Sequence, residues 1–298
     1  MSEVRFDNRV VVVTGAGNGV GRAHALAFAE RGAKVVVNDL GGSTSGTGSD
    51  TKSADIVVDE IRAAGGEATA NYDSVTDGES IINTAIEAYG KIDVLVNNAG
   101  ILRDTAFHKM TDEDWDIIYD VHVRGTYSPT RAAWNLMREQ EYGRIIFTTS
   151  ASGIYGNFGQ TNYSAAKLGI YGFAQSLAVE GRKKNVWVNT IAPMAVSRLT
   201  ENITQESMVE MSRPSLVAPL VLKLCHENSS DTGGLYEVGL GWFAKLRWER
   251  SMGGMLDYKQ EITVDDLEAI WDEVVDFSQS EHPRHVGEAG KTAYSRAK

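Results

Sequence analysis

Short runs of apolar residues recur along the first 240 residues of the chain. Residues 10–14 (VVVVT) form an unbroken β-branched run, and residues 34–39 and 93–97 repeat that character. Such runs are typical of strands that are buried on both faces of a sheet. Four further segments carry the same signal, namely 68–72, 144–149, 186–192 and 235–238. The pattern therefore predicts about seven strands.

Helical patterns occupy the stretches between these runs. Helices are predicted over 21–31, 50–64, 78–89, 111–137 and 162–182. Thr111 and Asp114 predict a capping box at the start of the fourth helix, and Pro129 predicts a kink inside it. Because strands alternate with helices, we expect an α/β fold in residues 1–240. It is a doubly wound, mostly seven-stranded parallel sheet of the Rossmann type, with helices on both faces.

Two regions depart from this alternation. Residues 41–52 are rich in Gly, Ser and Thr and predict a mobile loop after the second strand. Residues 241–298 predict a C-terminal extension that packs on the same domain, because they are too few and too polar for a second core. Within this extension, residues 241–250 mix aromatic with basic side chains, and residues 263–277 predict one capped amphipathic helix.

Composition and charge narrow the class of protein. Acidic residues outnumber basic ones by 40 to 29, so the formal net charge is −11 and nucleic-acid binding is disfavoured. Cys225 is the one cysteine, which excludes an intrachain disulfide and a four-cysteine zinc site. No apolar run approaches the ~18 residues of a membrane span. The first residues lack the apolar centre of a signal peptide, and the last three are not a peroxisomal Ser-Lys-Leu-type ending, so we expect a cytoplasmic location.

A glycine-rich turn lies between the first strand and the first helix. Gly15, Gly19 and Gly21 permit a tight turn and close approach of a pyrophosphate to the helix N-terminus. Asp39 follows the second strand, where a carboxylate accepts hydrogen bonds from an adenosine ribose and repels a 2′-phosphate. With Asn18 and no cation in the turn, this favours NAD over NADP. The alternatives are a purely structural turn and an aspartate that initiates a loop.

Ser150, Tyr163 and Lys167 form the candidate catalytic set. Tyr163 and Lys167 are four apart on a predicted helix and share one face, and Ser150 ends a strand thirteen residues earlier. A lysine cation beside a phenol is expected to lower the pKa of Tyr163 towards neutrality and make it a usable acid or base. The same spacing at Tyr294 and Lys298 is interpreted as accidental, because it lies in a polar tail.

The chain resembles the short-chain dehydrogenase/reductase family. The matching segments are 14–21, 97–100 (NNAG), Ser150, Tyr163 with Lys167, and 189–193. Segments such as NDLGGSTSGTG, NNAGILRD and APLVLKLCHE are more closely similar to its (3R)-hydroxyacyl-CoA dehydrogenase branch, found in peroxisomal multifunctional β-oxidation enzymes and stand-alone bacterial relatives.

The resemblance implies roles for the matched residues. Tyr163 would accept the proton of the substrate hydroxyl, Lys167 would lower its pKa and hold the nicotinamide ribose, and Ser150 would orient the substrate oxygen. Ser150 and Tyr163 would thus bind substrate, and no metal is implied. The residues implied to bind NAD are Gly15, Asn18, Gly19, Val20, Gly21, Asp39, Leu40, Asp73, Ser74, Val75, Asn98, Ala99, Gly100, Tyr163, Lys167, Pro193, Ala195, Val196, Ser197 and Arg198.

Two positions depart from the family pattern. His122 stands where members usually carry an asparagine that helps to hold a proton-relay water. It is a candidate catalytic residue through a ring nitrogen, and the alternative is a histidine satisfied by backbone groups. Met194 stands where a glycine usually follows Pro193, which changes the backbone freedom beside the nicotinamide.

Three functions remain open from the sequence. The first is NAD-dependent oxidation of a secondary alcohol, (3R)-3-hydroxyacyl-CoA to 3-oxoacyl-CoA, in fatty-acid or steroid side-chain β-oxidation. There, Lys245, Arg247 and Arg250 beside Trp242 and Trp248 would bind CoA phosphates, unless this is a solvated basic segment or a dimer contact. The second is a 17β-hydroxysteroid dehydrogenase, and the third is an NAD-binding module without turnover. By analogy we expect a homodimer or homotetramer formed through helices 111–137 and 162–182.

Overall fold

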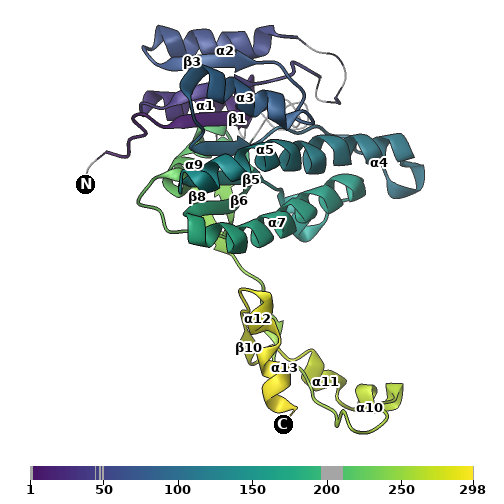
Figure 1. The fold of residues 1–298 in the computed structure, drawn as a ribbon. Coiled ribbons are helices and arrows are strands. Elements are labelled where there is room, and N and C mark those ends of the chain that lie inside the picture. The colour runs from purple at the N-terminus through teal and green to yellow at the C-terminus, as the bar shows by residue number, and fades with distance from the viewer. Residues whose placement is uncertain (1–2, 44, 47, 49, 196–210, 298) are drawn as a thin grey trace. The chain divides into compact units, whose positions relative to one another are not determined.

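The computed structural model describes residues 3–43, 45–46, 48, 50–195 and 211–297. It divides into two compact units, Met1–Lys245 and Leu246–Lys298. The first unit holds the large sheet and its covering helices (Figure 1). The expected packing of the C-terminal extension on the first domain stays a prediction.

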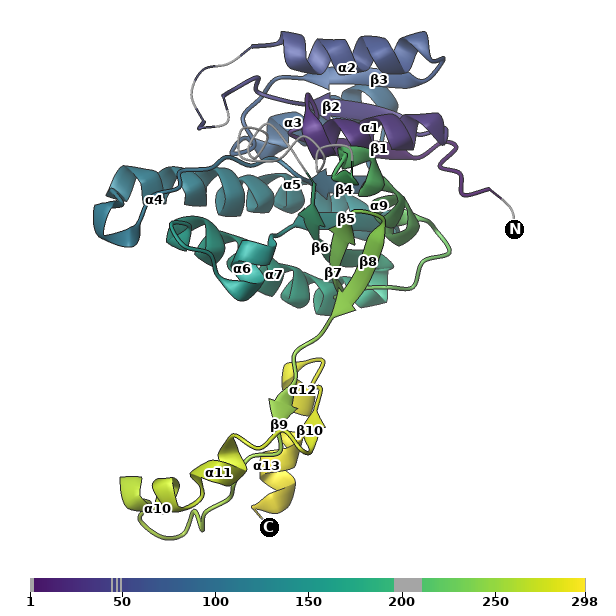
Figure 2. The ribbon, with the colours of Figure 1, turned by 180° about the vertical axis from the view of Figure 1, so that it is seen from behind.

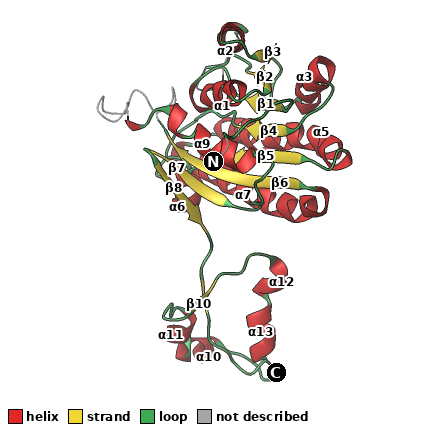
Figure 3. Ribbon diagram, turned by 90° about the vertical axis from the view of Figure 1, so that its left-hand side faces the viewer, coloured by secondary structure: helices red, strands yellow, loops and turns green. Residues whose placement is uncertain are grey.

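One sheet of eight strands forms the centre of the first unit, in the order β3-β2-β1-β4-β5-β6-β7-β8 (Figure 3). The strands are β1 (Val10–Thr14), β2 (Lys34–Asn38), β3 (Glu67–Asn71), β4 (Val94–Asn97), β5 (Gly143–Thr148), β6 (Val186–Met194), β7 (Leu235–Gly239) and β8 (Trp242–Leu246). Neighbouring strands pair in parallel from β3 through to β7, which confirms the Rossmann-type sheet. The strand order reverses at β1, which leaves a crevice at the carboxyl edge of the sheet.

The eighth strand was not expected from the sequence. It lies beside β7 at the sheet edge (Figure 2) and follows it after two residues, Leu240 and Gly241, with φ values of 55° and 79°. Two left-handed residues are typical of the type I′ turn that joins antiparallel strands. Since β8 is an edge strand with largely exposed side chains, it lacks the unbroken apolar run that marks buried strands.

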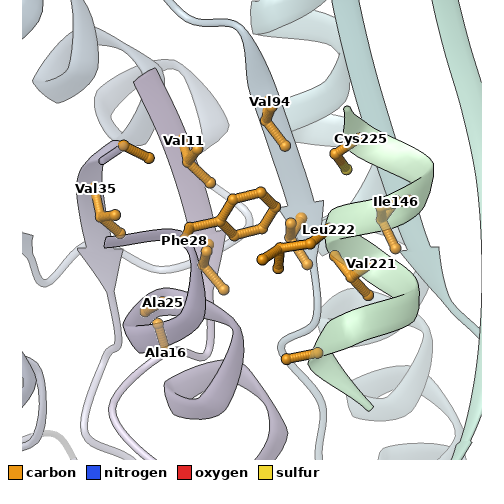
Figure 4. Packing of buried hydrophobic residues seen from close by; sticks show 14 of the residues in the cluster. Val11, Ala16, Ala25, Phe28, Val35, Val94, Ile146, Val221, Leu222 and Cys225 are labelled. Atoms are coloured by element: carbon orange, nitrogen blue, oxygen red, sulfur yellow. The ribbon is translucent and has the colours of Figure 1, made fainter. Parts of the chain in front are cut away.

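Helices cover both faces of the sheet, as expected, and two of the helices of this unit, α4 and α6, pack on other helices. They are α1 (Gly19–Glu30), α2 (Lys52–Ala63), α3 (Gly78–Tyr89), α4 (Asp112–Ile118), α5 (Gly125–Glu139), α6 (Ala151–Tyr155), α7 (Thr161–Gly181) and α9 (Ala218–Cys225). Val11 and Val13 of β1 point into a core with α1, α2 and α9, in which the Phe28 ring points toward Leu222 (Figure 4). Val10 and Val12 point to the other face, against α3, α5 and α7.

The long helix expected over residues 111–137 is interrupted. Its capping box is present, because the Thr111 hydroxyl accepts from the Asp114 N–H at 3.1 Å. A π-helical turn, Tyr119–Arg124, separates α4 from α5, whereas Pro129 lies inside α5 without ending it. Pro129 instead lies where α3 crosses α5 closely, since a Cβ on Gly78 would come within 2.1 Å of the Pro129 nitrogen. The interruption therefore precedes the proline.

The second unit is small and open. A two-stranded antiparallel sheet pairs β9 (Arg250–Ser251) with β10 (Ser280–Glu281). Its helices are α10 (Val264–Ala269), α11 (Trp271–Val274), α12 (Val286–Ala289) and α13 (Lys291–Arg296). The single helix expected over 263–277 is therefore two helices, although its Thr263 cap is present. None of the described side chains of this unit is fully buried, so it has no core of its own.

Candidate active site

A cavity of about 520 Å³ lies at the carboxyl edge of the sheet. Residues that directly follow β1, β2, β4 and β5 line it. The sequence-predicted site residues that line it are Gly15, Asn18, Gly19, Val20, Asp39, Leu40, Asp73, Ser74, Val75, Asn98, Ala99, Gly100, His122, Ser150, Tyr163, Lys167, Pro193 and Ala195. Gly21 lies outside this lining, and Val196, Ser197 and Arg198 lie outside the described residues.

The glycine-rich turn after β1 is held by close backbone contacts. Gly15 has a φ of 62°, and a Cβ there would come within 2.7 Å of the Ala99 Cα. A Cβ on Gly21 would lie 2.1 Å from the Gly15 carbonyl oxygen, so Gly21 packs the helix on the turn. The Asn98 amide donates to the carbonyl oxygens of Thr14 and Gly15 at 3.0 and 3.1 Å. Only glycine therefore fits two of these positions.

The N-terminus of α1 opens toward this cavity. Asn18 makes no side-chain cap hydrogen bond, and the first turn of α1 carries no acidic residue. The free N–H groups and the positive end of the helix dipole are therefore available to an anion beside Gly19 and Val20, which line the cavity. This cradle fits the pyrophosphate of a dinucleotide.

Asp39 has two backbone partners in the structure. Its Oδ2 accepts from the Gly17 N–H at 2.8 Å, and its Oδ1 accepts from the Gly41 N–H at 2.7 Å. The second contact is the loop-initiating contact that the sequence left as an alternative. Since a carboxylate accepts about four hydrogen bonds, these contacts leave room for a ribose diol in the cavity.

The three candidate catalytic side chains meet in the same cavity. Ser150 directly precedes α6, and its hydroxyl accepts from the Ser152 N–H at 3.2 Å. Tyr163 and Lys167 are one turn apart on α7. The Lys167 Nζ donates to the Thr148 carbonyl oxygen at 2.7 Å and lies 5.5 Å from the centre of the Tyr163 ring.

Burial reverses the expected pKa of the phenol. The pKa of Tyr163 is raised to about 12, chiefly by burial; a hydrogen bond with Ser150 lowers it, and the negative charge of Asp104 adds to the rise. Burial also lowers the pKa of Lys167 to about 7. The expectation that Lys167 brings the pKa of Tyr163 towards neutrality is therefore wrong for the protein alone. Burial disfavours the charged form of both groups, so the phenol keeps its proton and the lysine tends to lose its own.

His122 lies in the π-helical turn and is fully buried. Its Nε2 is 2.9 Å from the Ile101 carbonyl oxygen and 3.2 Å from the Ile101 nitrogen, while its Nδ1 has no partner among the described residues. Its ring meets the Tyr163 ring edge-on, with centroids 5.1 Å apart. Burial holds the pKa of His122 well below its usual range, so the ring is neutral and positions residues rather than carrying charge.

Further polar residues line the cavity although the sequence did not point to them. Four of them, Asp104, Ser152, Asn157 and Gln160, are joined by hydrogen bonds. The Gln160 amide donates to Asp104 at 2.7 Å and accepts from Ser152 and Asn157 at 2.7 and 2.9 Å. The signal available was the run of polar residues directly before Tyr163.

Several other sequence-predicted positions have structural roles or separate locations. Met194 ends β6 opposite Gly239, where a Cβ would lie 2.1 Å from the Met194 carbonyl oxygen. Lys245 pairs with Asp231 at 3.2 Å, which favours the solvated-segment interpretation of this basic stretch. Tyr294 is 77% exposed on α13.

Within the described ranges, no helix is long and apolar enough to cross a membrane, and no cluster of side chains is arranged to hold a metal.

Comparison with known proteins identifies the family. Residues 9–208 match the model of the short chain dehydrogenases. The chain is 57% identical over 289 residues to the mouse peroxisomal multifunctional enzyme type 2, which covers 97% of this chain and 39% of that protein. It is 48% identical over 274 residues to a protein of Mycobacterium tuberculosis named as a short-chain type dehydrogenase/reductase, covering 91% of this chain and 95% of that protein.

Solved structures agree with this assignment. Full-length peroxisomal multifunctional enzyme type 2 from Drosophila melanogaster has a TM-score of 0.84 at 44% identity, covering 98% of this chain and 50% of that one. A 7α-hydroxysteroid dehydrogenase complexed with NADH and 7-oxo glycochenodeoxycholic acid has a TM-score of 0.72 at 28% identity, covering 81% of this chain and 98% of that one. The chain thus spans between 32% and 64% of the length of the multifunctional relatives.

The expected cytoplasmic location is wrong. Five relatives with identities between 50% and 57% are all named as peroxisomal enzymes, which contradicts that expectation. The family match and the cavity geometry agree with each other. The chain therefore belongs to the short chain dehydrogenase family and is an oxidoreductase.

Proposed function

We propose that this protein is an NAD-dependent dehydrogenase that oxidises (3R)-3-hydroxyacyl-CoA to 3-oxoacyl-CoA in fatty-acid or steroid side-chain β-oxidation. The observation that carries this is the meeting of Ser150, Tyr163 and Lys167 in one cavity with the glycine-rich turn. The multifunctional relatives, some named hydratase-dehydrogenase-epimerase, support the substrate class. Because the chain spans only part of these relatives, the proposal concerns the dehydrogenase step alone.

Ser150 and Tyr163 handle the substrate hydroxyl. The Ser150 hydroxyl donates to the substrate oxygen and orients it, and the Tyr163 oxygen accepts the proton that leaves as the alcohol becomes a ketone. Bound NAD supplies the hydride acceptor and a positively charged ring that favours the phenolate. The cavity wall supplies orientation and excludes water from these side chains.

The proton of the substrate hydroxyl passes to the buried pair of Tyr163 and Lys167. In the protein alone, the pKa of Tyr163 is about 12 and the pKa of Lys167 is about 7, so the phenol holds its proton while the amine readily loses its own. Tyr163 therefore works as a base only where added positive charge stabilises its phenolate. Turnover in the oxidation direction should accordingly rise with pH up to an alkaline limit.

The choice of NAD over NADP rests on Asp39. Its carboxylate lies at the end of β2 and lines the cavity. Lys167 is the one Lys or Arg among the described lining residues, and it lies at the catalytic end. Among the described residues that line the cavity beside the turn, a 2′-phosphate therefore finds a negative charge and no basic partner.

An enantiomer pair tests the proposed reaction. NADH formation is followed by absorbance with (3R)-3-hydroxyacyl-CoA, with the matched (3S) enantiomer and with a 17β-hydroxysteroid. The proposal expects turnover of the (3R) thioester at least about a hundredfold above the other two. Preferential steroid turnover would support a hydroxysteroid dehydrogenase. NAD binding without NADH formation on any of these substrates would support a binding module without turnover.

Self-association through α5 and α7 is also proposed. Gly169 and Gly172 of α7 are exposed, and a Cβ on either would meet no atom within 4 Å. Tyr127 of α5 is half exposed. Exposed glycines permit close helix packing against a second copy, so we expect a homodimer or homotetramer. Light scattering should show a multiple of the 32.4 kDa chain mass that falls to one chain in Gly172→Glu.

A further inference from the structure

A short loop is fastened to the residues directly before Tyr163. The Thr105 N–H donates to the Gly159 carbonyl oxygen at 2.8 Å. The buried Asn162 amide donates to the Arg103 carbonyl oxygen at 3.3 Å. These bonds join residues more than fifty positions apart. They hold Asp104, which lies between Arg103 and Thr105, in the wall of the cavity that contains Ser150 and Tyr163.

Gln160 fixes the orientation of the Asp104 carboxylate. The Gln160 Oε1 accepts from Ser152 and Asn157, so its Nε2 is left to donate to Asp104 Oδ2 at 2.7 Å. Only 9% of Gln160 is exposed. Since both donors to its oxygen hold the amide in place, rotation of Gln160 would break two hydrogen bonds.

No described cation pairs with the Asp104 carboxylate. Arg103 is engaged elsewhere, because its Nε donates to the Ser45 carbonyl oxygen at 2.8 Å and its Nη1 lies 3.7 Å from Asp114. Lys167 is the one Lys or Arg among the described lining residues and donates to a backbone carbonyl. His122 is neutral at working pH, since burial holds its pKa far down. Asp104 is therefore the one carboxylate among the described lining residues near Ser150, Tyr163 and Lys167, and burial, which lowers the pKa of Lys167 to about 7, leaves that amine largely neutral at alkaline pH.

We propose that Asp104, held by Gln160, is a specificity-determining residue that rejects substrates with a free carboxylate beside the reacting carbon and admits the neutral thioester. This inference rests on the proposed function. In a free 3-hydroxy acid the carboxylate is two bonds from the carbon that is oxidised. When that carbon is at the catalytic side chains, the substrate carboxylate is repelled by the negative charge of Asp104. In the thioester the same carbonyl is uncharged, and the phosphates of CoA are remote from it.

The experiment compares two substrates that differ in this charge. kcat/KM is measured for the uncharged pantetheine thioester of (3R)-3-hydroxybutyrate and for free (3R)-3-hydroxybutyrate, in wild type and in the isosteric variant Asp104→Asn. Where the free acid gives no turnover, its inhibition constant against the thioester is measured instead. The ratio of acid to thioester should rise roughly three- to tenfold in Asp104→Asn, and the effect should shrink as salt is added.

A matched variant separates local from general charge effects. Asp116→Asn removes an exposed carboxylate of α4 and should leave the ratio unchanged. Gln160→Met removes the donor to Asp104 while keeping the side chain's length, so it should raise the ratio by part of the Asp104→Asn effect. A second readout is the pH profile, since Asp104 raises the pKa of Tyr163. In Asp104→Asn, the pH above which kcat/KM for the thioester stops rising should therefore be lower than in wild type.

The outcomes distinguish this inference from the proposed function. No thioester turnover in wild type would overturn the proposed function. Thioester turnover with the same acid-to-thioester ratio in wild type and Asp104→Asn would overturn the specificity role alone. An equal rise of the ratio in Asp116→Asn would also overturn it, because the effect would then be one of net charge.

Discussion

The buried Lys167 should lower the stability of the fold. Lys167 is 3% exposed, and burial lowers its pKa from 10.5 to about 7. Between these two pH values the unfolded chain binds a proton that the folded chain does not, so the free energy of unfolding rises with pH. Replacing the ammonium by an apolar side chain of similar length, in Lys167→Met, removes this penalty together with the proposed catalytic group.

The expected size follows from the two pKa values. Near pH 8, about 2.5 units below the unfolded pKa, the penalty is roughly 3 kcal/mol at about 1.4 kcal/mol per unit. Lys167→Met also leaves the Thr148 carbonyl oxygen without its 2.7 Å donor, which costs about 1 kcal/mol. The variant should therefore be more stable than wild type by about 2 kcal/mol near pH 8, and the difference should shrink near pH 10.

Urea unfolding followed by tryptophan fluorescence measures this difference. Lys109→Met, at an exposed position, is the control and should change stability by less than about 0.5 kcal/mol. Activity is measured on the same samples and should be lost in Lys167→Met only. A variant less stable than wild type near pH 8, or a difference independent of pH, would refute the burial argument.

Three further predictions concern histidine burial and the cofactor end. His24 is fully buried with no partner for either ring nitrogen among the described residues, and burial lowers its pKa to about 3. Stability should therefore fall by about 2 kcal/mol from pH 7 to pH 5 in urea unfolding, and much less in His24→Leu. His122→Leu should lower kcat about tenfold. His122→Asn keeps a hydrogen-bond partner for Ile101 and should retain most of the wild-type kcat, whereas equal losses in the two variants would argue against a positioning role. Asp39→Ala should narrow the kcat/KM preference for NAD over NADP by at least about tenfold, and an unchanged ratio would argue against the ribose role.

The sequence predicted the sheet and the glycine-rich turn because both depend on local chemistry. Buried parallel strands require unbroken apolar runs such as residues 10–14, and the close contacts of Gly15 and Gly21 exclude any side chain. Ser150 was predicted because the carboxyl ends of parallel strands meet at one edge of the sheet. Each of these inferences used neighbours in sequence or a rule of topology.

The remainder depended on contacts between distant residues. The sequence missed the Asp104–Gln160 pair because it joins two loops 56 positions apart. It gave the wrong direction for the pKa of Tyr163, because burial is set by the whole fold and not by one lysine a helical turn away. It also missed β8, whose exposed edge position removes the apolar signal.

Tyr163→Phe tests the proposed chemistry most directly, because it removes one oxygen atom and keeps the ring that packs on His122. Single-turnover NADH formation from (3R)-3-hydroxyacyl-CoA should slow by about 10²–10⁴-fold, while the Kd of NAD stays within about twofold of wild type. A variant that transfers hydride at the wild-type rate with NAD bound would show that this phenol does not accept the proton.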